Sequence, residues 1–292
     1  MFIGQQKIRE TLDIIAEACR NANRQFPHIL FEGYAGHGKS TLARMVSQKM
    51  DGDLKEINAA TIRKPNDVID CLMTLEPNTY LFIDEIHRLP LKTQEVLYTA
   101  CEDWYVNDNV LDKVLIERFT LIGATTSVGL LSHPMKSRFK HVFQLEGYSN
   151  EEIRQIAEKY SRTIDFEIDS TPLIEYCRNN PRLAKDIVEW VRDFCQAKKI
   201  SPVEDSIHKA MRQKGVYQEG LTVRDIDYLE FVYKSKSWVG LETISNCLGV
   251  DKLTIRDFIE PYLVKRGYLL RGKRGRYTTQ KAARFLKNVK ET

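Results

Sequence analysis

The segment GYAGHGKST, residues 33–41, constrains the fold more than any other part of this chain. It matches the pattern GxxxxGK[ST] in full and lies between a short apolar run and a segment with helical spacing. In such a loop the glycines let consecutive backbone N–H groups surround phosphate oxygens, Lys39 adds a positive charge, and the Ser40 hydroxyl can hold Mg²⁺. The sequence therefore predicts an ATP site between a strand and a helix, with the binding residues Gly33, Gly36, His37, Gly38, Lys39, Ser40 and Thr41.

Short apolar runs recur along the first half of the chain. Residues 27–32 precede the phosphate-binding loop, and 54–57, 80–83 and 119–122 are three further runs, with helical patterns between the first three. Such runs are typical of buried strands, and strands that alternate with helices form parallel sheets covered on both faces. The first half is therefore predicted to be an α/β domain with a parallel sheet.

Two carboxylates follow the run 80–83 directly. An apolar strand that ends in Asp84 and Glu85, downstream of a phosphate-binding loop, is the usual second half of a nucleotide site. We expect Asp84 to complete the Mg²⁺ shell with Ser40. Glu85 is then placed to orient or deprotonate the attacking water.

Other positions are candidates for contacts with the γ-phosphate. Thr125 and Thr126 end the strand predicted at 119–122, and Arg138 follows a Ser-His-Pro segment that reads as a loop. Taken alone, the threonines are as well explained by a polar strand end, and Arg138 by a solvated charge. At this distance from the loop, Arg138 can also serve as a finger that reaches the ATP of a neighbouring subunit. Arg182 opens a later helix, from which it could reach the γ-phosphate.

The second half of the chain has a different pattern. A helix is expected to start at 149–152 and run to about 162, and further helical segments are expected near 171–179 and at 181–199, so that together they form an all-helical unit. A capping-box spacing at Thr222–Asp225 then opens three helices, at about 222–234, 240–248 and 252–266. Two short strands around a basic turn follow, over 268–279. Three helices and a two-stranded ribbon are the outline of a winged-helix DNA-binding module.

Positive charge is concentrated at the C-terminus. Residues 265–292 hold ten of the 44 Lys and Arg residues but only one of the 40 Asp and Glu residues. A polyanion is the expected partner at that end. Phosphate contacts of this kind give salt-dependent affinity with little sequence readout, although a merely solvated tail is the alternative. The predicted DNA-binding residues are Lys265, Arg266, Arg271, Lys273, Arg274 and Arg276.

The composition excludes several classes of protein. No apolar run approaches the roughly 20 residues of a membrane helix, and the first residues lack the order of a signal peptide, so we expect a cytoplasmic protein. The six cysteines form no CxxC or CxxH pair, which argues against a structural zinc site or a disulfide framework. They are predicted to be small buried hydrophobic residues.

Together these features resemble the RuvB family of bacterial Holliday-junction branch-migration ATPases. The resemblance spans nearly the whole chain in order: FIGQ (2–5), GYAGHGKST (33–41), LFIDEIHRL (81–89), EVLYTACED (95–103), FTLIGATT (119–126), PMKSRF (134–139), NPRLAKDIVEWVRDF (180–194) and VGLETISNCLG through GRYTT (239–279). The last of these is far more specific to the family than the ATPase motifs, which many AAA+ proteins share.

The resemblance implies three domains: an AAA+ ATPase domain at 1–147, a helical lid at 148–220 and a winged helix at 221–292. It implies a homo-oligomeric ring, six-fold in the family, that hydrolyses ATP with Mg²⁺ and pulls duplex DNA from a four-way junction held by a partner protein. Carried over by motif, Lys39 and Ser40 are Walker A, Asp84 and Glu85 Walker B, Thr126 or Thr125 sensor 1, Arg138 the arginine finger and Arg182 sensor 2.

The chain also departs from the family pattern. No Arg-Pro segment precedes FIGQ, Ala35 stands where the family has proline, and Lys136 replaces the first arginine of a pair. The segment 104–118 is shorter than the family's β-hairpin, which docks onto the junction-binding partner. We therefore expect docking to a partner of the usual kind to be altered.

Two other functions compete with a DNA motor of the RuvB type. One is an AAA+ loader or switch that uses ATP for assembly on DNA and recruits a different partner, which the short segment 104–118 favours. The other is an ATP-binding transcription regulator. The presence of both Glu85 and Arg138 argues against the regulator, because a pure binding switch needs neither.

Overall fold

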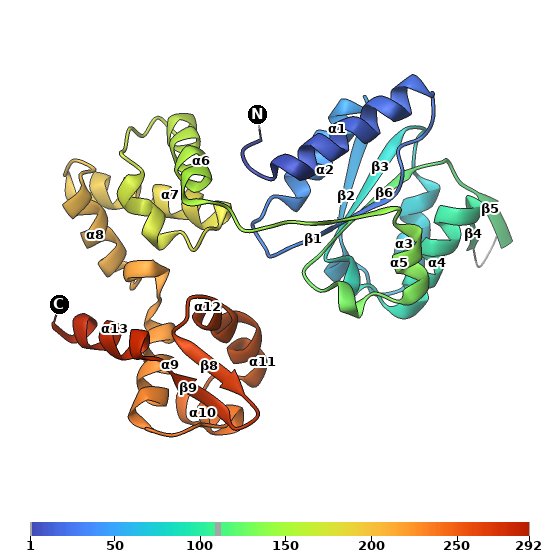
Figure 1. The fold of residues 1–292 in the computed structure, drawn as a ribbon. Helices are drawn as coiled ribbons and strands as arrows, with labels where there is room; N and C mark the ends of the chain where they lie inside the picture. Colours follow the sequence, from blue (N-terminus) through green and yellow to red (C-terminus); the bar gives the residue numbers. More distant parts are fainter. Residues whose placement is uncertain (1, 109–111, 292) are drawn as a thin grey trace. The chain divides into compact units, whose positions relative to one another are not determined.

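A computed structural model describes residues 2–108 and 112–291 (Figure 1). The chain divides into two compact units, Met1–Tyr160 with Asn179–Asp186, and Ser161–Arg178 with Ile187–Thr292. The first unit contains the phosphate-binding loop, and the second contains the basic C-terminal segment. The three-domain division at 147 and 220 stays a prediction.

A five-stranded sheet in the order β2-β3-β6-β1-β7 forms the centre of the first unit. Every pairing in it is parallel, which confirms the predicted sheet. The strands are β1 (Ile29–Glu32), β2 (Asp53–Asn58), β3 (Thr79–Asp84), β6 (Thr120–Thr125) and β7 (His141–Gln144). The sequence does not predict β7, because this edge strand is four residues long and holds only two apolar residues, Val142 and Phe143.

Helices cover both faces of this sheet (Figure 1). Along β3, Leu81 and Ile83 pack in one buried cluster, while Tyr80 and Phe82 pack in the other. Because successive side chains of a strand point to opposite faces, a strand buried on both sides needs apolar residues at consecutive positions, as β3 has at 80–83. The helices of this unit are α1 (Gln6–Asn21), α2 (Lys39–Lys49), α3 (Pro65–Met73), α4 (Leu91–Asp103), α5 (His133–Arg138) and most of α6 (Asn150–Thr163).

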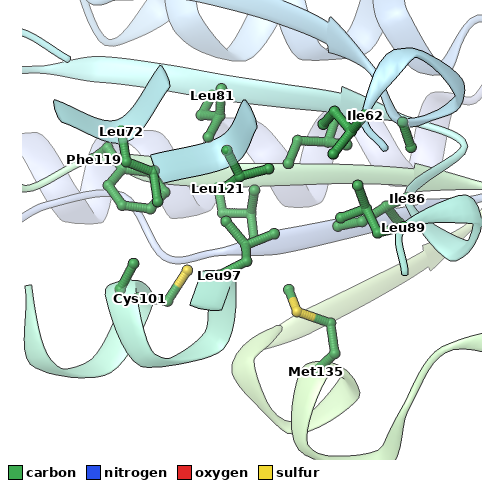
Figure 2. Close-up of a cluster of buried hydrophobic side chains, with 14 of the residues drawn as sticks. Ile62, Leu72, Leu81, Ile86, Leu89, Leu97, Cys101, Phe119, Leu121 and Met135 are labelled. Atoms are coloured by element: carbon green, nitrogen blue, oxygen red, sulfur yellow. The ribbon is translucent and has the colours of Figure 1, made fainter. Parts of the chain in front are cut away.

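Figure 2 shows the cluster on the side of α3 and α4, where Leu72 and Leu97 meet Leu81 and Leu121 of the sheet. All four side chains are completely buried. Full burial of such a side chain contributes roughly 1.5–3 kcal/mol. This packing holds the strands of the sheet in place. Asp84 and Thr125 are the last residues of β3 and β6, so both lie at the carboxyl edge of the sheet.

A short antiparallel hairpin follows α4. It pairs β4 (Tyr105–Asp108) with β5 (Asp112–Leu115), and residues 109–111 lie outside the described residues. The expectation for 104–118 was a shortened segment, and the structure shows that a two-stranded hairpin is nevertheless formed there. Leu115 on β5 is 78% exposed.

The second unit contains helical segments and then the three helices and ribbon of a winged helix, as predicted. Its first part comprises the 3₁₀ segment Thr171–Tyr176, the later turns of α7 (Pro181–Lys198) and α8 (Glu204–Gln213), which the sequence does not predict. The winged helix comprises α9 (Val223–Lys234), α10 (Leu241–Leu248), α11 (Lys252–Thr254), the π-helical η6 (Ile255–Ile259), α12 (Glu260–Lys265), β8 (Leu269–Gly272), β9 (Gly275–Thr278) and α13 (Gln280–Glu291).

The helix predicted at 252–266 contains a π-helical turn. Pro261 follows this turn, and proline has no N–H to donate and clashes with the carbonyl four residues earlier. Widening the preceding turn accommodates that ring.

The cysteine prediction is partly wrong. Cys19, Cys101, Cys177 and Cys195 are buried as expected, but Cys71 is only partly buried and Cys247 is exposed on α10.

Among the described residues, no helix is long and apolar enough to span a membrane.

Candidate nucleotide site and nucleic-acid interface

The phosphate-binding loop has the backbone that its glycines permit. Gly38 precedes α2 with φ 96°, and Gly36 has φ 83°, both in the left-handed region. A Cβ at Gly36 would lie 2.4 Å from Oδ1 of Asn180, and one at Gly38 would lie 3.0 Å from the ring of Phe2. The loop is thus closely surrounded, and its curvature fits a backbone cradle for phosphate.

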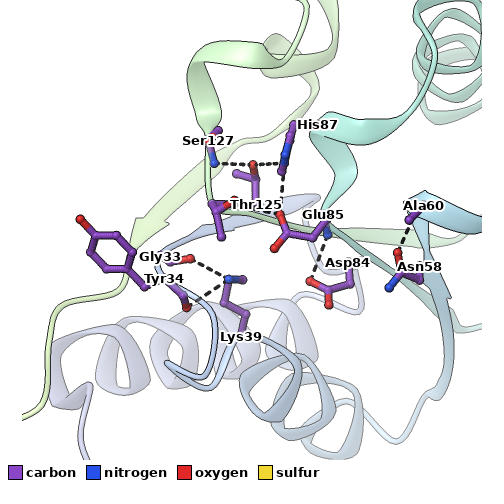
Figure 3. A network of polar contacts seen from close by, with 11 residues as sticks. Gly33, Tyr34, Lys39, Asn58, Ala60, Asp84, Glu85, His87, Thr125 and Ser127 are labelled. Carbon is purple, nitrogen blue, oxygen red and sulfur yellow. Dashed lines mark hydrogen bonds and ion pairs between the residues drawn. The ribbon is translucent and has the colours of Figure 1, made fainter. Parts of the chain in front are cut away.

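Lys39 is buried at the start of α2, with only 7% of its surface exposed. Its Nζ donates to the carbonyl oxygens of Gly33 at 2.6 Å and Tyr34 at 3.3 Å (Figure 3). Burial lowers the pKa of Lys39, and the charges of Glu85 and Asp84 oppose that shift. Hydrogen bonds from an ammonium group to phosphate oxygens are charge-assisted and therefore stronger than its bonds to neutral carbonyl oxygens. The position of Lys39 thus suits nucleotide binding.

Asp84 and Glu85 stand at the carboxyl end of β3, close to Lys39 (Figure 3). Oδ1 of Asp84 accepts a hydrogen bond from the Glu85 N–H at 3.0 Å. Glu85 itself has φ 50°, a left-handed conformation that costs a non-glycine residue about 1–3 kcal/mol. With this conformation the chain leaves the strand and enters the 3₁₀ turn Ile86–Arg88.

The Glu85 carboxylate is held by a small polar network. Its Oε2 accepts hydrogen bonds from Oγ1 of Thr126 at 3.1 Å and from the Thr126 N–H at 3.3 Å. The same oxygen lies 3.2 Å from Nδ1 of His87, which is also 2.9 Å from Oγ1 of Thr125. A proton on Nδ1 satisfies both oxygens, so His87 ties the carboxylate to the end of β6 (Figure 3).

Burial lowers the pKa of His87, and the charge of Glu85 partly opposes that shift. A neutral imidazole is therefore the form that this site favours at neutral pH. Sequence reasoning did not single out His87, although its place two residues after Glu85 was a usable signal.

The two predicted threonines have different surroundings. Thr126 contacts Glu85 directly, whereas Thr125 is fully buried and its hydroxyl accepts from the Ser127 N–H at 2.9 Å. Thr126 is therefore the one whose side chain reaches the carboxylate, and Thr125 supports His87.

The first turn of α7 lies against the phosphate-binding loop within the first unit. Asn180 Nδ2 donates to the Ala35 carbonyl oxygen at 2.9 Å, and Asn180 Oδ1 accepts from the Arg182 N–H at 2.9 Å. Arg182 is close enough that its charge lowers the pKa of Lys39. The structure thus brings Arg182 to the site, and Asn180 is a neighbour that sequence reasoning missed.

The N-terminal segment and Tyr148 also surround the loop. The Gln5 side chain donates to the Glu146 carbonyl oxygen at 2.7 Å and accepts from the Glu146 N–H at 3.3 Å. The Tyr148 hydroxyl donates to the His37 carbonyl oxygen at 2.8 Å. These bonds fix His37 and the FIGQ segment beside the phosphate cradle, although nothing local in the sequence marks Tyr148.

Arg138 ends α5 and pairs with Glu102 of α4, with Nη2 to Oε2 at 2.5 Å. Its guanidinium also lies over the ring of Tyr98. Nε of Arg138 is buried and has no hydrogen-bond partner among residues 2–108 and 112–291. The side chain is thus incompletely satisfied by the described residues.

The donors at the site fit Mg²⁺ held together with a nucleotide. Ser40 offers a hydroxyl in the first turn of α2 and Asp84 a carboxylate at the end of β3, and Mg²⁺ takes one or two such oxygens along with phosphates and water. Across the described part of the chain, no group of three or more His, Cys, Asp and Glu side chains is arranged to hold a metal alone.

The basic residues of the winged helix separate into two sets. Arg276 and Arg271 point to Glu260, which is completely buried: Arg276 Nε lies 2.6 Å from Oε1, and Arg271 Nη1 lies 3.3 Å from Oε2. Arg266 pairs with Glu219 at 2.8 Å. Lys265, Lys273 and Arg274 are exposed.

The prediction that all six side chains contact DNA stays a prediction. Arg276 is a mostly buried ion-pair partner with 13% of its side chain exposed, because strand alternation turns it toward the core. Lys265 at the end of α12, and Lys273 and Arg274 at the turn between β8 and β9, are exposed and could meet a polyanion without breaking such a pair.

Comparison with known proteins agrees with both halves of this description. Residues 1–145 match the model of the Holliday junction DNA helicase RuvB P-loop domain, and residues 218–287 match that of the RuvB C-terminal winged helix domain. The chain is 38% identical to the Holliday junction branch migration complex subunit RuvB of Acholeplasma laidlawii, over 98% of this chain and 88% of that protein.

Other relatives give the same result. The corresponding subunit of Campylobacter lari is 37% identical over 98% of this chain and 89% of its own length. The solved structure of the Thermotoga maritima RuvB Holliday junction branch migration motor aligns with a TM-score of 0.86 and 34% identity, covering 98% of this chain and 95% of that one.

Proposed function

This chain belongs to the RuvB family, and we propose that it is an ATP-driven DNA motor that moves the branch point of Holliday junctions by translocating duplex DNA. The observation that carries the proposal is the Glu85 network beside a complete phosphate cradle, in a chain that also has an exposed basic wing. A DNA-binding protein that needed ATP only as a structural ligand would need no such carboxylate.

We propose the following roles for the site residues. The backbone of the loop and Lys39 bind the β- and γ-phosphates, and Arg182 contacts the γ-phosphate from α7. Glu85 accepts a proton from, or orients, the water that attacks the γ-phosphate, while Thr126 and His87 hold its carboxylate in position. Mg²⁺, when bound by Ser40 and Asp84, supplies charge neutralisation at the phosphates.

Arg138 completes the site of a neighbouring subunit in this proposal. Its pairing with Glu102 holds it at the end of α5, and an arginine finger contributes about 10³–10⁵ in turnover. An assembly of subunits, a six-membered ring in the family pattern, is then required for hydrolysis.

Arg138→Ala tests this role. We expect its turnover to fall by about 10³ or more while ATP affinity stays near that of the wild type. Lys136→Ala, on the same short helix, is the matched control and should keep full turnover. Hydrolysis should partly return when Arg138→Ala is mixed with Glu85→Gln, because one kind of interface then combines an intact Glu85 with an intact Arg138. Full turnover by Arg138→Ala alone would refute the shared site.

A loader that uses ATP only to assemble on DNA is the second candidate, because the hairpin β4–β5 has strands of only four residues each. The two candidates differ in one outcome: a motor dissociates four-way junctions with a junction-binding partner, whereas a loader never does.

A further inference from the structure

An exposed aromatic pair lies on the winged helix. Trp238 and Tyr277 have ring centroids 5.6 Å apart with an angle of 31° between the ring planes. Trp238 is 39% exposed and Tyr277 is 38% exposed. Large aromatic rings bury about 150–250 Å² each in a typical core. Two rings that are this exposed therefore lose much of the hydrophobic stabilisation that full burial would give.

Strand alternation explains why the pair faces outward. Tyr277 lies on β9 between Arg276, which turns inward to Glu260, and Thr278, which is buried. Tyr277 therefore points to the opposite face of the two-stranded ribbon. Its register partner on β8 is Leu270, which is 50% exposed. We name the exposed set Trp238, Leu270 and Tyr277 the outer face of the wing.

The outer face is held rigidly. The segment that carries Trp238 pairs with β9, since Val239 and Arg276 exchange backbone hydrogen bonds of 2.9 and 2.8 Å. Gly275 makes this approach feasible, because a Cβ there would lie 2.4 Å from the Val239 carbonyl oxygen. A Cβ at Gly272 would lie 3.6 Å from Cζ3 of Trp238, so the indole is seated against the turn.

Positive charge borders the outer face. Lys273 and Arg274 occupy the turn between Gly272 and Gly275, and Lys236 stands two residues before Trp238. All three are exposed and form no ion pair within the described part of the chain. Aromatic rings bordered by cations match a nucleic-acid strand, whose phosphates bind the cations while its bases stack on the rings.

We propose that the outer face of the wing is a stacking site for unpaired DNA bases, with Lys273 and Arg274 on the adjoining phosphates. Paired bases are stacked on one another and covered, so only bases released from the helix offer their faces to Trp238 and Tyr277. Such bases arise where strands separate, and in this respect the inference rests on the proposed action at a branch point.

Fluorescence of Trp238 tests the contact directly. The chain has three tryptophans, and Trp238→Phe removes one indole but keeps a ring that can stack. A duplex with a single-stranded thymine tail should quench wild-type emission, and this part of the quenching should be absent in Trp238→Phe although binding persists. Equal quenching in both proteins would place Trp238 away from the bases.

Affinity provides the second readout. Trp238→Leu keeps an apolar side chain but loses the aromatic face, and we expect it to bind the tailed duplex roughly 5- to 100-fold more weakly than Trp238→Phe. A blunt duplex of the same length should bind both variants equally. Lys273→Ala should weaken both DNAs and reduce the salt slope of binding by about 1, whereas Trp238→Leu should leave that slope unchanged.

Each contrary result overturns the inference. An equal loss on both DNAs would mean contact with paired DNA, and no loss on either would leave the face to a protein partner. ATP hydrolysis in the presence of blunt duplex separates this inference from the proposed motor. If Trp238→Leu retains DNA-stimulated ATP hydrolysis, the proposed motor function is supported whatever the result with the tailed duplex. If DNA does not stimulate ATP hydrolysis by the wild type, the motor proposal is wrong, independently of base stacking.

Discussion

Two glutamates, Glu85 in the first unit and Glu260 in the second, show how differently a protein holds a carboxylate. Glu260 is completely buried and accepts from Arg276 at 2.6 and 3.1 Å, from Arg271 at 3.3 Å and from the Tyr228 hydroxyl at 2.9 Å. Glu85 keeps 20% of its side chain exposed, and its contacts, to Thr126 and His87, are 3.1–3.3 Å long.

The difference is one of charge compensation. Two arginines neutralise Glu260, which makes it a fixed structural ion, and removing either side of such a pair leaves a buried charge. Glu85 is held by a hydroxyl, an amide and an imidazole whose pKa is lowered by burial. Longer bonds to neutral groups on a strained backbone keep a carboxylate available for proton transfer and movement.

Glu85→Gln should have the largest effect on chemistry and little effect on stability. We expect turnover to fall roughly 10²–10⁴-fold, because the amide cannot accept a proton, while the free energy of unfolding changes by less than about 1 kcal/mol. Steady-state ATP hydrolysis and urea unfolding measure the two quantities. A loss of stability as large as that of Glu260→Gln would erase the contrast between the two sites.

Glu260→Gln should have the opposite profile. It leaves Arg276 with an uncompensated charge, so the winged unit should lose about 3–5 kcal/mol of stability, while ATP hydrolysis without DNA stays near the wild-type rate. Hydrogen exchange at α9 and β9 follows the unfolding of this unit.

Glu260→Met combined with Arg276→Met is the control for that result. It should be less destabilised than Glu260→Gln, since neither charge then remains. A larger loss in the double variant would mean that packing, and not charge, explains the single one.

His87→Phe should give a smaller, purely catalytic effect. It keeps a ring but removes the nitrogen that holds Glu85, so we expect the turnover to fall about 2- to 12-fold with unchanged ATP affinity. Ser127→Ala is the matched control, because Thr125 is bonded by the backbone N–H of Ser127. Unchanged turnover in His87→Phe would remove this residue from the catalytic network.

Acidification should produce the smallest effect, confined to the first unit. Burial lowers the pKa of His28, so the folded form resists protonation that the unfolded chain accepts below about pH 6.5. Stability is therefore complete above pH 6.5 and declines as the pH falls from there toward the lowered pKa. His28→Asn, whose carbonyl oxygen could still accept from the Leu121 N–H, should flatten this decline in thermal melts at pH 7 and pH 5.5. An unchanged slope would assign the decline to other groups.

Much of the fold could be predicted because its signals are local. The phosphate-binding loop is contiguous, and the runs that become β1, β3 and β6 are mostly apolar because both faces of the sheet are covered. The capping box at Thr222 is likewise a three-residue spacing, and the structure confirms it with reciprocal bonds to Asp225.

The features that sequence reasoning missed depend on contacts between distant residues. Asn180 meets Ala35 across 145 positions, and Tyr148 meets His37 across 111. Arg276 was grouped with the DNA contacts because a basic turn shows charge but not direction. Only its register opposite Arg271, above the buried Glu260, reveals that it faces inward.

The most direct test of the account is steady-state ATP hydrolysis with and without four-way-junction DNA, for the wild type and for Glu85→Gln. We predict that junction DNA raises the wild-type rate and does not restore the reduced rate of Glu85→Gln at any DNA concentration. A wild-type rate that stays the same at saturating junction DNA would contradict a DNA-coupled motor and favour a loader that uses ATP only for assembly.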